Sequence, residues 1–199
     1  MAVTYPLDIL TGFPGWSTEF DLLQRQELSR TAGGTTIAKD MGTPLWKAAF
    51  QSRVLSPNTL DMWRAKLNSL EGSLQRFMGR PMSRCYPIAH PNGRGLGDVS
   101  AVTVARITLN KVVTLNGAPA DYKSSIGDYV QIGRHLYQIV GLDGGVEVRP
   151  HLAPGTAVGN TVVLVRPSVP MIIVPATLST TADAGTGRGT ITFQAIESR

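Results

Sequence analysis

A mainly β fold is predicted by three features of this sequence of 199 residues. Turn-forming residues are frequent, with 21 Gly and 13 Pro, while charged residues make up only 17%. This balance is typical of many short strands joined by turns. Apolar and polar residues alternate in several segments, as they do in half-buried strands. With 42% apolar residues, the chain can bury the core of one domain or of two small ones.

The first third is expected to contain an antiparallel pair and a longer strand. The segments 17–30 and 36–41 flank the turn sequence TAGG, which favours a hairpin. Residues 45–56 then alternate with a period of two. The residues expected on the buried face of this strand are Trp46, Ala48, Phe50, Ser52 and Val54.

A single helix is predicted after this strand. Ser56 suits an N-cap and Pro57 the first helical position. An apolar stripe with spacings of three and four follows, consisting of Leu60, Trp63, Leu67 and Leu70. Burial of each large apolar side chain contributes about 2 kcal/mol, so the stripe should hold the helix across a sheet. Gly72 is expected to end the helix, and residues 73–81 are expected to form a strand.

A second unit is predicted over residues 82–168. It begins with a turn-rich segment, 81–98, that has no sustained period. Short strand-like segments follow, among them a hairpin over 126–141 that turns at Gly133 and Arg134. The others are 99–109, 111–118, 145–152 and 160–170. Their number and spacing favour a small closed β-barrel, which leaves no exposed strand edges.

The C-terminal segment is expected to return to the first sheet. It contains two longer strand-like runs joined by a loop rich in Gly and Thr, with Ile191, Phe193 and Ala195 on one face. The most economical connection pairs these runs with the N-terminal strands. The prediction is therefore a discontinuous domain of residues 1–81 with 169–199, into which residues 82–168 are inserted.

The positive charge does not by itself indicate a nucleic-acid site. The formal net charge is +5 and the isoelectric point is about 9.7, which would suit an anionic partner if the charges were grouped. The densest basic stretch holds Arg76, Arg80, Arg84 and Arg94. These residues are scattered and lack the interleaved aromatic residues that stack on single strands. A solvated or subunit-facing basic loop is therefore favoured over nucleic-acid binding.

The sequence also indicates the compartment of folding. Cys85 is the only cysteine, so no disulfide can form within the chain, and a reducing cytoplasm is expected. The first 16 residues lack the basic and apolar regions of a secretory signal. The longest apolar run, 170–176, is far shorter than the roughly 20 residues that a membrane-spanning helix needs.

No catalytic, cofactor-binding or metal-binding residue is predicted. His90, His135 and His151 are far apart in sequence, and Cys85 with His90 lacks the surroundings of a nucleophile. His135 is expected to be an exposed polar residue at the hairpin turn. The GRGLG run at 93–97 is followed by a strand-like segment where a dinucleotide site needs a helix. Acidic residues in turns should bond their own backbone, namely Asp98, Asp121, Asp128 and Asp143.

Tryptophans could mark a carbohydrate site, but Trp46 and Trp63 fit the predicted core faces. Trp16 remains available as a contact residue. A pair of acids for glycoside hydrolysis is not singled out.

Four motifs follow one another in a distinctive order. Trp46, Ala48 and Phe50 precede the capped helix, and Gly127, Asp128 and Val130 lie in the hairpin. The third motif runs from Val148 to Leu152 and includes Gly159. The last consists of Phe193, Ala195, Ile196 and Glu197. In this order the motifs, which span most of the chain, resemble the distal tail protein of long-tailed (siphovirus-like) phages and related gene-transfer particles.

This resemblance implies a structural virion protein rather than an enzyme. The fold it implies is a tail-tube-like β-sandwich with one flanking α-helix, plus an inserted small β-barrel. The implied partners are copies of the same chain in a hexameric ring, the tail tube protein, and the tail hub with tip or adhesin proteins. The implied location is the virion tail tip, after assembly in the host cytoplasm. The segment 81–98 departs from the family pattern, which leaves the orientation of the insertion open.

Three other functions stay open at this point. They are a nucleic-acid-binding β-barrel protein, a glycan hydrolase carried on a tail, and another tail component such as a tube or tail-completion protein. The first would bind DNA or RNA with an affinity that falls steeply as salt rises.

Overall fold

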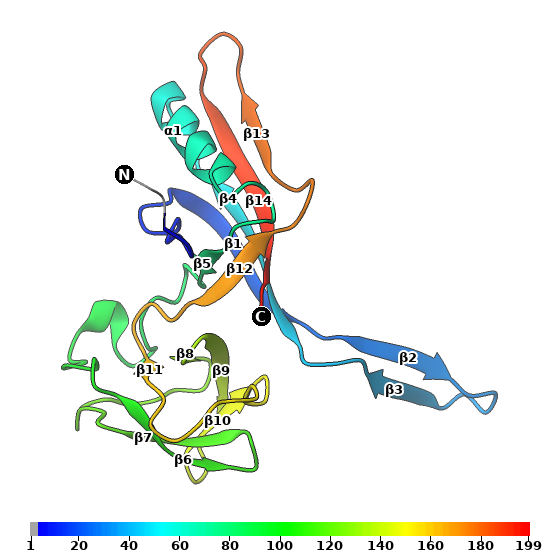
Figure 1. The fold of residues 1–199 in the computed structure, drawn as a ribbon, viewed down its shortest axis with the longest axis vertical. Coiled ribbons are helices and arrows are strands. Elements are labelled where there is room, and N and C mark those ends of the chain that lie inside the picture. The colour runs from blue at the N-terminus through cyan, green and yellow to red at the C-terminus, as the bar shows by residue number, and fades with distance from the viewer. Residues whose placement is uncertain (1–3) are drawn as a thin grey trace.

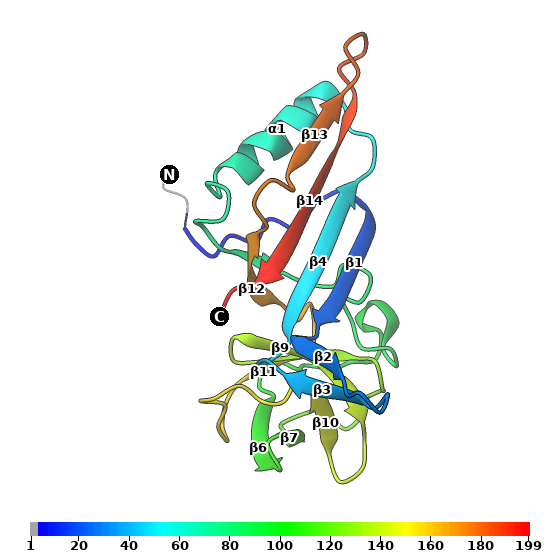
Figure 2. The ribbon, with the colours of Figure 1, turned by 90° about the vertical axis from the view of Figure 1, so that its right-hand side faces the viewer.

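The computed structural model describes residues 4–199, which form antiparallel sheets and one α-helix (Figures 1 and 2). The prediction of a mainly β fold is confirmed. Hydrogen bonding defines two six-stranded sheets and a separate two-stranded ribbon. Residues 1–3 lie outside the described residues. They belong to the predicted N-terminal unit and to the segment that is expected to lack a secretory signal.

The large sheet is built from both ends of the described chain. Its strands, in spatial order, are β1 (Gly15–Leu23), β4 (Leu45–Ser52), β14 (Gly189–Glu197), β12 (Val169–Ile173) and β5 (Phe77–Gly79). The strand β13 (Ser179–Ala182) pairs with the first half of β14. Phe193 of β14 lies opposite Phe50 of β4. The expected return of the C-terminal segment to the N-terminal strands is therefore confirmed.

One face of the large sheet carries the main core. Alternation places Trp46, Ala48, Phe50, Ile191, Phe193 and Ala195 on this face, each no more than 1% exposed. The helix α1 (Pro57–Asn68) covers it through its buried residues Leu60, Trp63 and Leu67. Phe13 fills the space between helix and sheet, because its ring meets Trp63 edge-on at 5.3 Å and Phe193 at 5.8 Å.

The helix is confirmed, but it ends four residues before Gly72. It stops at Asn68, and the chain then turns through Glu71 and Gly72, which have φ angles of 50° and 68°. Leu70, at the end of the predicted stripe, is fully buried although it lies beyond the helix. Ser56 has the extended backbone of an N-cap, but its hydroxyl bonds Thr59 Oγ1 rather than a helix N–H. Apolar burial, rather than capping, therefore positions this helix.

Two predicted strands are shorter than expected. The strand β4 ends at Ser52, and Val54 is 64% exposed, so its predicted burial is wrong. The reason is that Leu55 bonds Gly189 at the start of β14, which turns the chain toward the helix. In the segment 73–81, only Phe77–Gly79 forms a strand, and Leu74 is 78% exposed.

The small sheet contains only strands from the middle of the chain. Its order is β11 (Val162–Val163), β8 (Tyr129–Ile132), β9 (His135–Gly141), β10 (Val146–Arg149), β7 (Val112–Asn116) and β6 (Thr103–Thr108). Its two edges are joined by the bonds from Val104 N to Asn160 O (3.0 Å) and from Val162 N to Val102 O (2.9 Å). A second core of Val, Ile and Leu residues lies within it. The hairpin turning at Gly133 and Arg134 is confirmed.

The predicted strand over 160–170 is wrong in its extent. It divides into the two-residue β11 in the small sheet and the start of β12 in the large one. Residues 81–98 form turns and one 3-10 turn, η1 (Pro91–Gly93), as their composition indicates.

A two-stranded ribbon projects away from both sheets (Figure 1). It consists of β2 (Gln26–Arg30) and β3 (Thr36–Asp40), and we call residues 26–40 the arm. Every residue of its two strands is exposed. The antiparallel pair predicted around TAGG is confirmed, but the arm has no core of its own.

Candidate functional site

The hairpin β8–β9 joins the two sheets. On one side, Val130, Ile132 and Ile139 pack in the core of the small sheet. On the other side, Tyr129 and Leu136 pack in the core of the large sheet. Because side chains alternate between the faces of a strand, this hairpin is a wall shared by both cores. We call this contact region the joint.

The aromatic side of the joint is fixed by Trp46. Its ring lies 5.6 Å from that of Tyr129, and Tyr129 also meets Phe20 edge-on at 6.2 Å. The Trp46 Nε1–H donates a hydrogen bond of 2.7 Å to the carbonyl oxygen of Leu136. Burial raises the pKa of the Tyr129 hydroxyl above its ordinary value, and the negative charge of Asp21 adds to this shift.

A buried carboxylate completes the joint. The side chain of Glu197 is 1% exposed, and its Oε2 accepts a bond of 3.0 Å from the backbone N–H of Trp46. Its Oε1 accepts a bond of 2.8 Å from Arg199 Nε. His135 Nδ1 lies 3.8 Å from the same oxygen. The guanidinium and the backbone donor allow this charge to remain in a buried position.

The prediction that His135 is an exposed turn residue is wrong. Its side chain is 27% exposed, and its Nδ1 atom is buried. The residue begins β9 and faces Glu197, because the close of the hairpin is pressed against the end of β14. The burial of Glu197 could nonetheless have been predicted from the sequence, because this residue continues the alternation of Phe193 and Ala195.

Two polar residues fasten the segment 81–98 to the small sheet. Asp128 accepts hydrogen bonds from Ile88 N (2.7 Å) and Ser125 N (2.8 Å). Asp128 thus bonds the backbone of its own turn, as expected, and it also holds Ile88, which lies 40 residues away in a segment without strands. His90 Nε2 accepts from Lys123 N at 3.1 Å, and its Nδ1 lies 3.2 Å from Arg94 O.

Both nitrogens of His90 are thus engaged with the backbone. The thiol of Cys85 contacts the carbonyl oxygen of Met82 at 3.5 Å.

Asp98 and Asp183 behave as ordinary turn acids. A backbone N–H from Ser100 lowers the pKa of Asp98, and the hydroxyl and N–H of Thr186 lower that of Asp183.

A cavity of about 450 Å³ opens at the joint, and we call it the joint cavity. Apolar residues form much of its wall, and charged side chains stand around it. The lining residues used below are Pro6, Arg76, Met78, Arg134, His135, Val169, Pro170, Glu197 and Arg199. They come from the N-terminal segment, the flank of β5, the hairpin turn, β12 and the end of β14.

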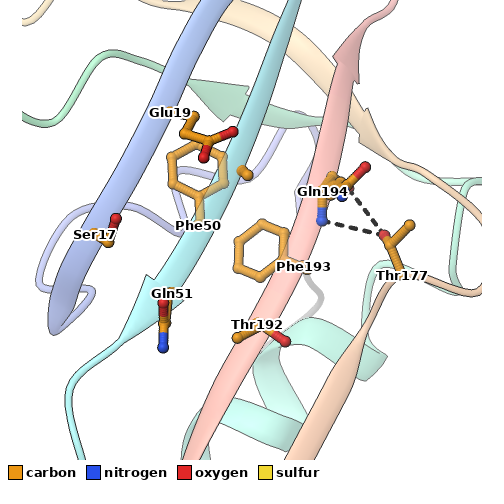
Figure 3. A pocket seen from close by; sticks show the side chains of 9 residues that line it. Ser17, Glu19, Phe50, Gln51, Thr177, Thr192, Phe193 and Gln194 are labelled. Carbon is orange, nitrogen blue, oxygen red and sulfur yellow. Dashed lines mark hydrogen bonds between the residues drawn. The ribbon is translucent and has the colours of Figure 1, made fainter.

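The opposite face of the large sheet is open and polar. A hollow of about 180 Å³ lies on this face. It is lined by Ser17 and Glu19 of β1, Gln51 of β4, and Thr192 and Gln194 of β14 (Figure 3). Thr177 closes one side, because its hydroxyl accepts a hydrogen bond of 3.1 Å from Gln194 N. The hydroxyl and amide groups here suit a hydrated contact surface.

The predicted basic stretch does not form one surface. Arg80 is only 7% exposed and lies 3.2 Å from Asp8, with a further bond of 2.7 Å to the Thr11 hydroxyl. It is therefore not a solvated loop residue. Arg76, Arg84 and Arg94 are exposed. Trp16, the predicted contact residue, is 79% exposed, while Trp46 and Trp63 are in the core as expected.

No protein-family model matches this chain, and no curated protein is significantly similar to it in sequence. Among residues 4–199, no helix is long and apolar enough to cross a membrane. Within the same range no cluster of three or more His, Cys, Asp or Glu residues could hold a metal ion.

Proposed function

We propose that this chain is a structural virion protein that forms a ring at the distal end of a phage tail. In this role it connects the tail tube to the hub and to host-recognition proteins. The proposal combines the order of sequence motifs, which resembles that of distal tail proteins, with the surfaces described above. It assigns the chain no catalytic activity.

The finer description of the fold belongs to the same proposal. Residues 1–81 with 169–199 act as a tail-tube-like β-sandwich that forms the ring wall. Residues 82–168 act as an inserted small β-barrel that holds tip components. The pairing of β14 with β4 and the bonds joining the two edges of the small sheet support this division.

The arm is the observation that carries the proposal. An isolated two-stranded ribbon is at best marginally stable in water, and this one exposes Leu28 by 70% and Ile37 by 54%. These residues lie on opposite faces of the ribbon, because Leu28 pairs with Ala38 and Ile37 with Ser29. A ribbon with apolar residues on both faces is suited to lie between neighbouring subunits, and a repeated head-to-tail contact of this kind gives a ring when the rotation between subunits closes.

The test is assembly of the purified protein and of arm variants. Light scattering and negative-stain microscopy should show rings with a central channel, if necessary in the presence of tube protein. The double variant Leu28→Ser, Ile37→Ser should remain folded but lose rings. The matched control Leu74→Ser removes a leucine that is 78% exposed outside the arm, and it should assemble normally.

A protein that stays monomeric at all concentrations and also fails to join tails in an infected lysate contradicts the proposal. Rings that survive the loss of both arm residues would contradict the role of the arm.

A further inference from the structure

We propose that the joint cavity binds an organic anion, specifically a carboxylate attached to a compact apolar group. The inference concerns a site separate from the arm, and it goes beyond the proposed assembly function. It rests on unpaired positive charge at the cavity and on an apolar wall of suitable size.

The charges at the cavity are not balanced within the described chain. Glu197 is already bound by Arg199 and by the Trp46 backbone N–H. Within residues 4–199, Arg76 and Arg134 have neither an ion pair nor a side-chain hydrogen bond. Both line the cavity, from the flank of β5 and from the hairpin turn. A planar guanidinium matches a carboxylate through two parallel hydrogen bonds, which favours this anion as the ligand.

The remaining wall favours an apolar body on the ligand. Pro6, Met78, Val169 and Pro170 contribute apolar surface. The cavity volume of about 450 Å³ lies within the range of roughly 300–1,000 Å³ that is usual for small-molecule sites. A hydrated inorganic ion would leave this apolar surface uncovered, so the wall distinguishes an organic acid from phosphate or sulfate.

Such a ligand would touch both sheets. Arg134 and His135 belong to the hairpin of the small sheet, whereas Arg76, Val169 and Pro170 belong to the large sheet or its flank. Occupancy of the cavity would therefore hold the two sheets together.

The experiment titrates the full chain with hexanoate and measures binding by calorimetry and by amide chemical shifts. Hexanamide, which has the same apolar body without the charge, and inorganic phosphate are the comparison probes. We expect saturable binding of hexanoate with shifts confined to the cavity residues. The double variant Arg76→Gln, Arg134→Gln should raise the Kd by about tenfold or more, as expected for the loss of charge-assisted bonds.

The control variant is Arg94→Gln, which removes one exposed arginine outside the cavity and should leave the Kd unchanged. Hexanamide binding as tightly as hexanoate would overturn the assignment of an anion. Phosphate binding as tightly as hexanoate would overturn the assignment of an apolar body. Absence of saturable binding, or equal binding by the double variant, would overturn the site. All of these readouts use the isolated chain and do not depend on ring formation.

Discussion

At the scale of single residues, buried polar groups are held by partners that lie far away in the sequence. Arg80 pairs with Asp8 across 72 positions, and Glu197 bonds the backbone of Trp46 across 151. Each pair fixes one segment to another at a point where apolar packing alone would not specify the position. Removing Asp8 would leave the charge of Arg80, which is 7% exposed, with only the Thr11 hydroxyl as a side-chain partner, and such a loss costs more than the bond itself contributes.

Asp8→Asn should destabilise the protein more at neutral pH than in acid. Burial tends to raise the pKa of Asp8, but bonds from Thr11 and Arg80 and the charge of Arg80 outweigh it, so the pKa lies below its ordinary value. The folded pKa is therefore lower than the unfolded pKa, which is about 3.9. The stabilisation is present above the unfolded pKa and is lost as the pH falls through the folded pKa.

Thermal unfolding of both proteins from pH 7 to pH 2.5 would measure this effect, and the difference in Tm should narrow toward the acid end. The control is Asp61→Asn, whose partner Arg64 is an exposed i,i+3 neighbour; pairs of this type contribute about 0.3–0.5 kcal/mol. A difference in Tm that persists unchanged at pH 2.5 would rule out the ion pair as its source.

Trp46→Phe should lower the free energy of unfolding by about 1–3 kcal/mol or more, because the variant leaves a buried carbonyl without its hydrogen-bond donor. The bond lost is the one from Nε1 to Leu136 O at 2.7 Å, and the smaller ring also packs less well against Tyr129. Urea unfolding would measure the change. Trp16→Phe, at a position 79% exposed, is the control and should differ little from the parent protein. Equal stability of the two variants would show that the indole bond contributes nothing to the joint.

At the scale of secondary structure, the helix depends on its apolar stripe. Leu67 is 1% exposed and Met62 is 46% exposed on the same helix. Leu67→Ala should therefore cost about 2–5 kcal/mol, while Met62→Ala should cost little. Chemical denaturation of both variants gives the comparison, and similar losses at the two positions would mean that the stripe does not hold the helix on the sheet.

The sequence predicts elements better than it predicts their ends. The alternation of Trp46, Ala48 and Phe50 and the spacing of Leu60, Trp63 and Leu67 are local signals, and the structure confirms both. The end of β4 and the division of 160–170 depend instead on which strand accepts the next hydrogen bond. That partner lies more than a hundred residues away for Leu55, so no local pattern specifies it.

The candidate surfaces were harder to predict. Arg76, Arg134 and Arg199 share a cavity, but the sequence places them in three unrelated segments. Only the docking of the hairpin on the large sheet brings them together, and that docking depends on Tyr129 and Leu136, which read as ordinary strand residues. The buried position of Glu197 was the one accessible signal, through its place in the alternation of β14.

At the scale of the whole molecule, the two sheets should open together because they share a hairpin. Leu136 is 1% exposed and contributes to the core of the large sheet, although its strand belongs to the small one. Leu136→Ala should therefore increase amide hydrogen exchange in β4 and β14 as well as in β8 and β9. Val140→Ala, on the same strand at a position 39% exposed, is the control. Faster exchange confined to the small sheet would show that the sheets are uncoupled.

The pairing of β5 with β12 has one further consequence. The chain leaves the large sheet at Gly79 and re-enters it at Val169, and these two residues are direct partners in the sheet. The sheet therefore holds the two ends of the intervening segment side by side, so loops of that segment outside the hairpin β8–β9 could change in length without displacing β5 or β12. A Cβ on Gly79 would collide with the buried side chain of Met171, so a larger residue there would require that side chain to move. The exit and the return of the chain thus form one fixed point at the edge of the large sheet.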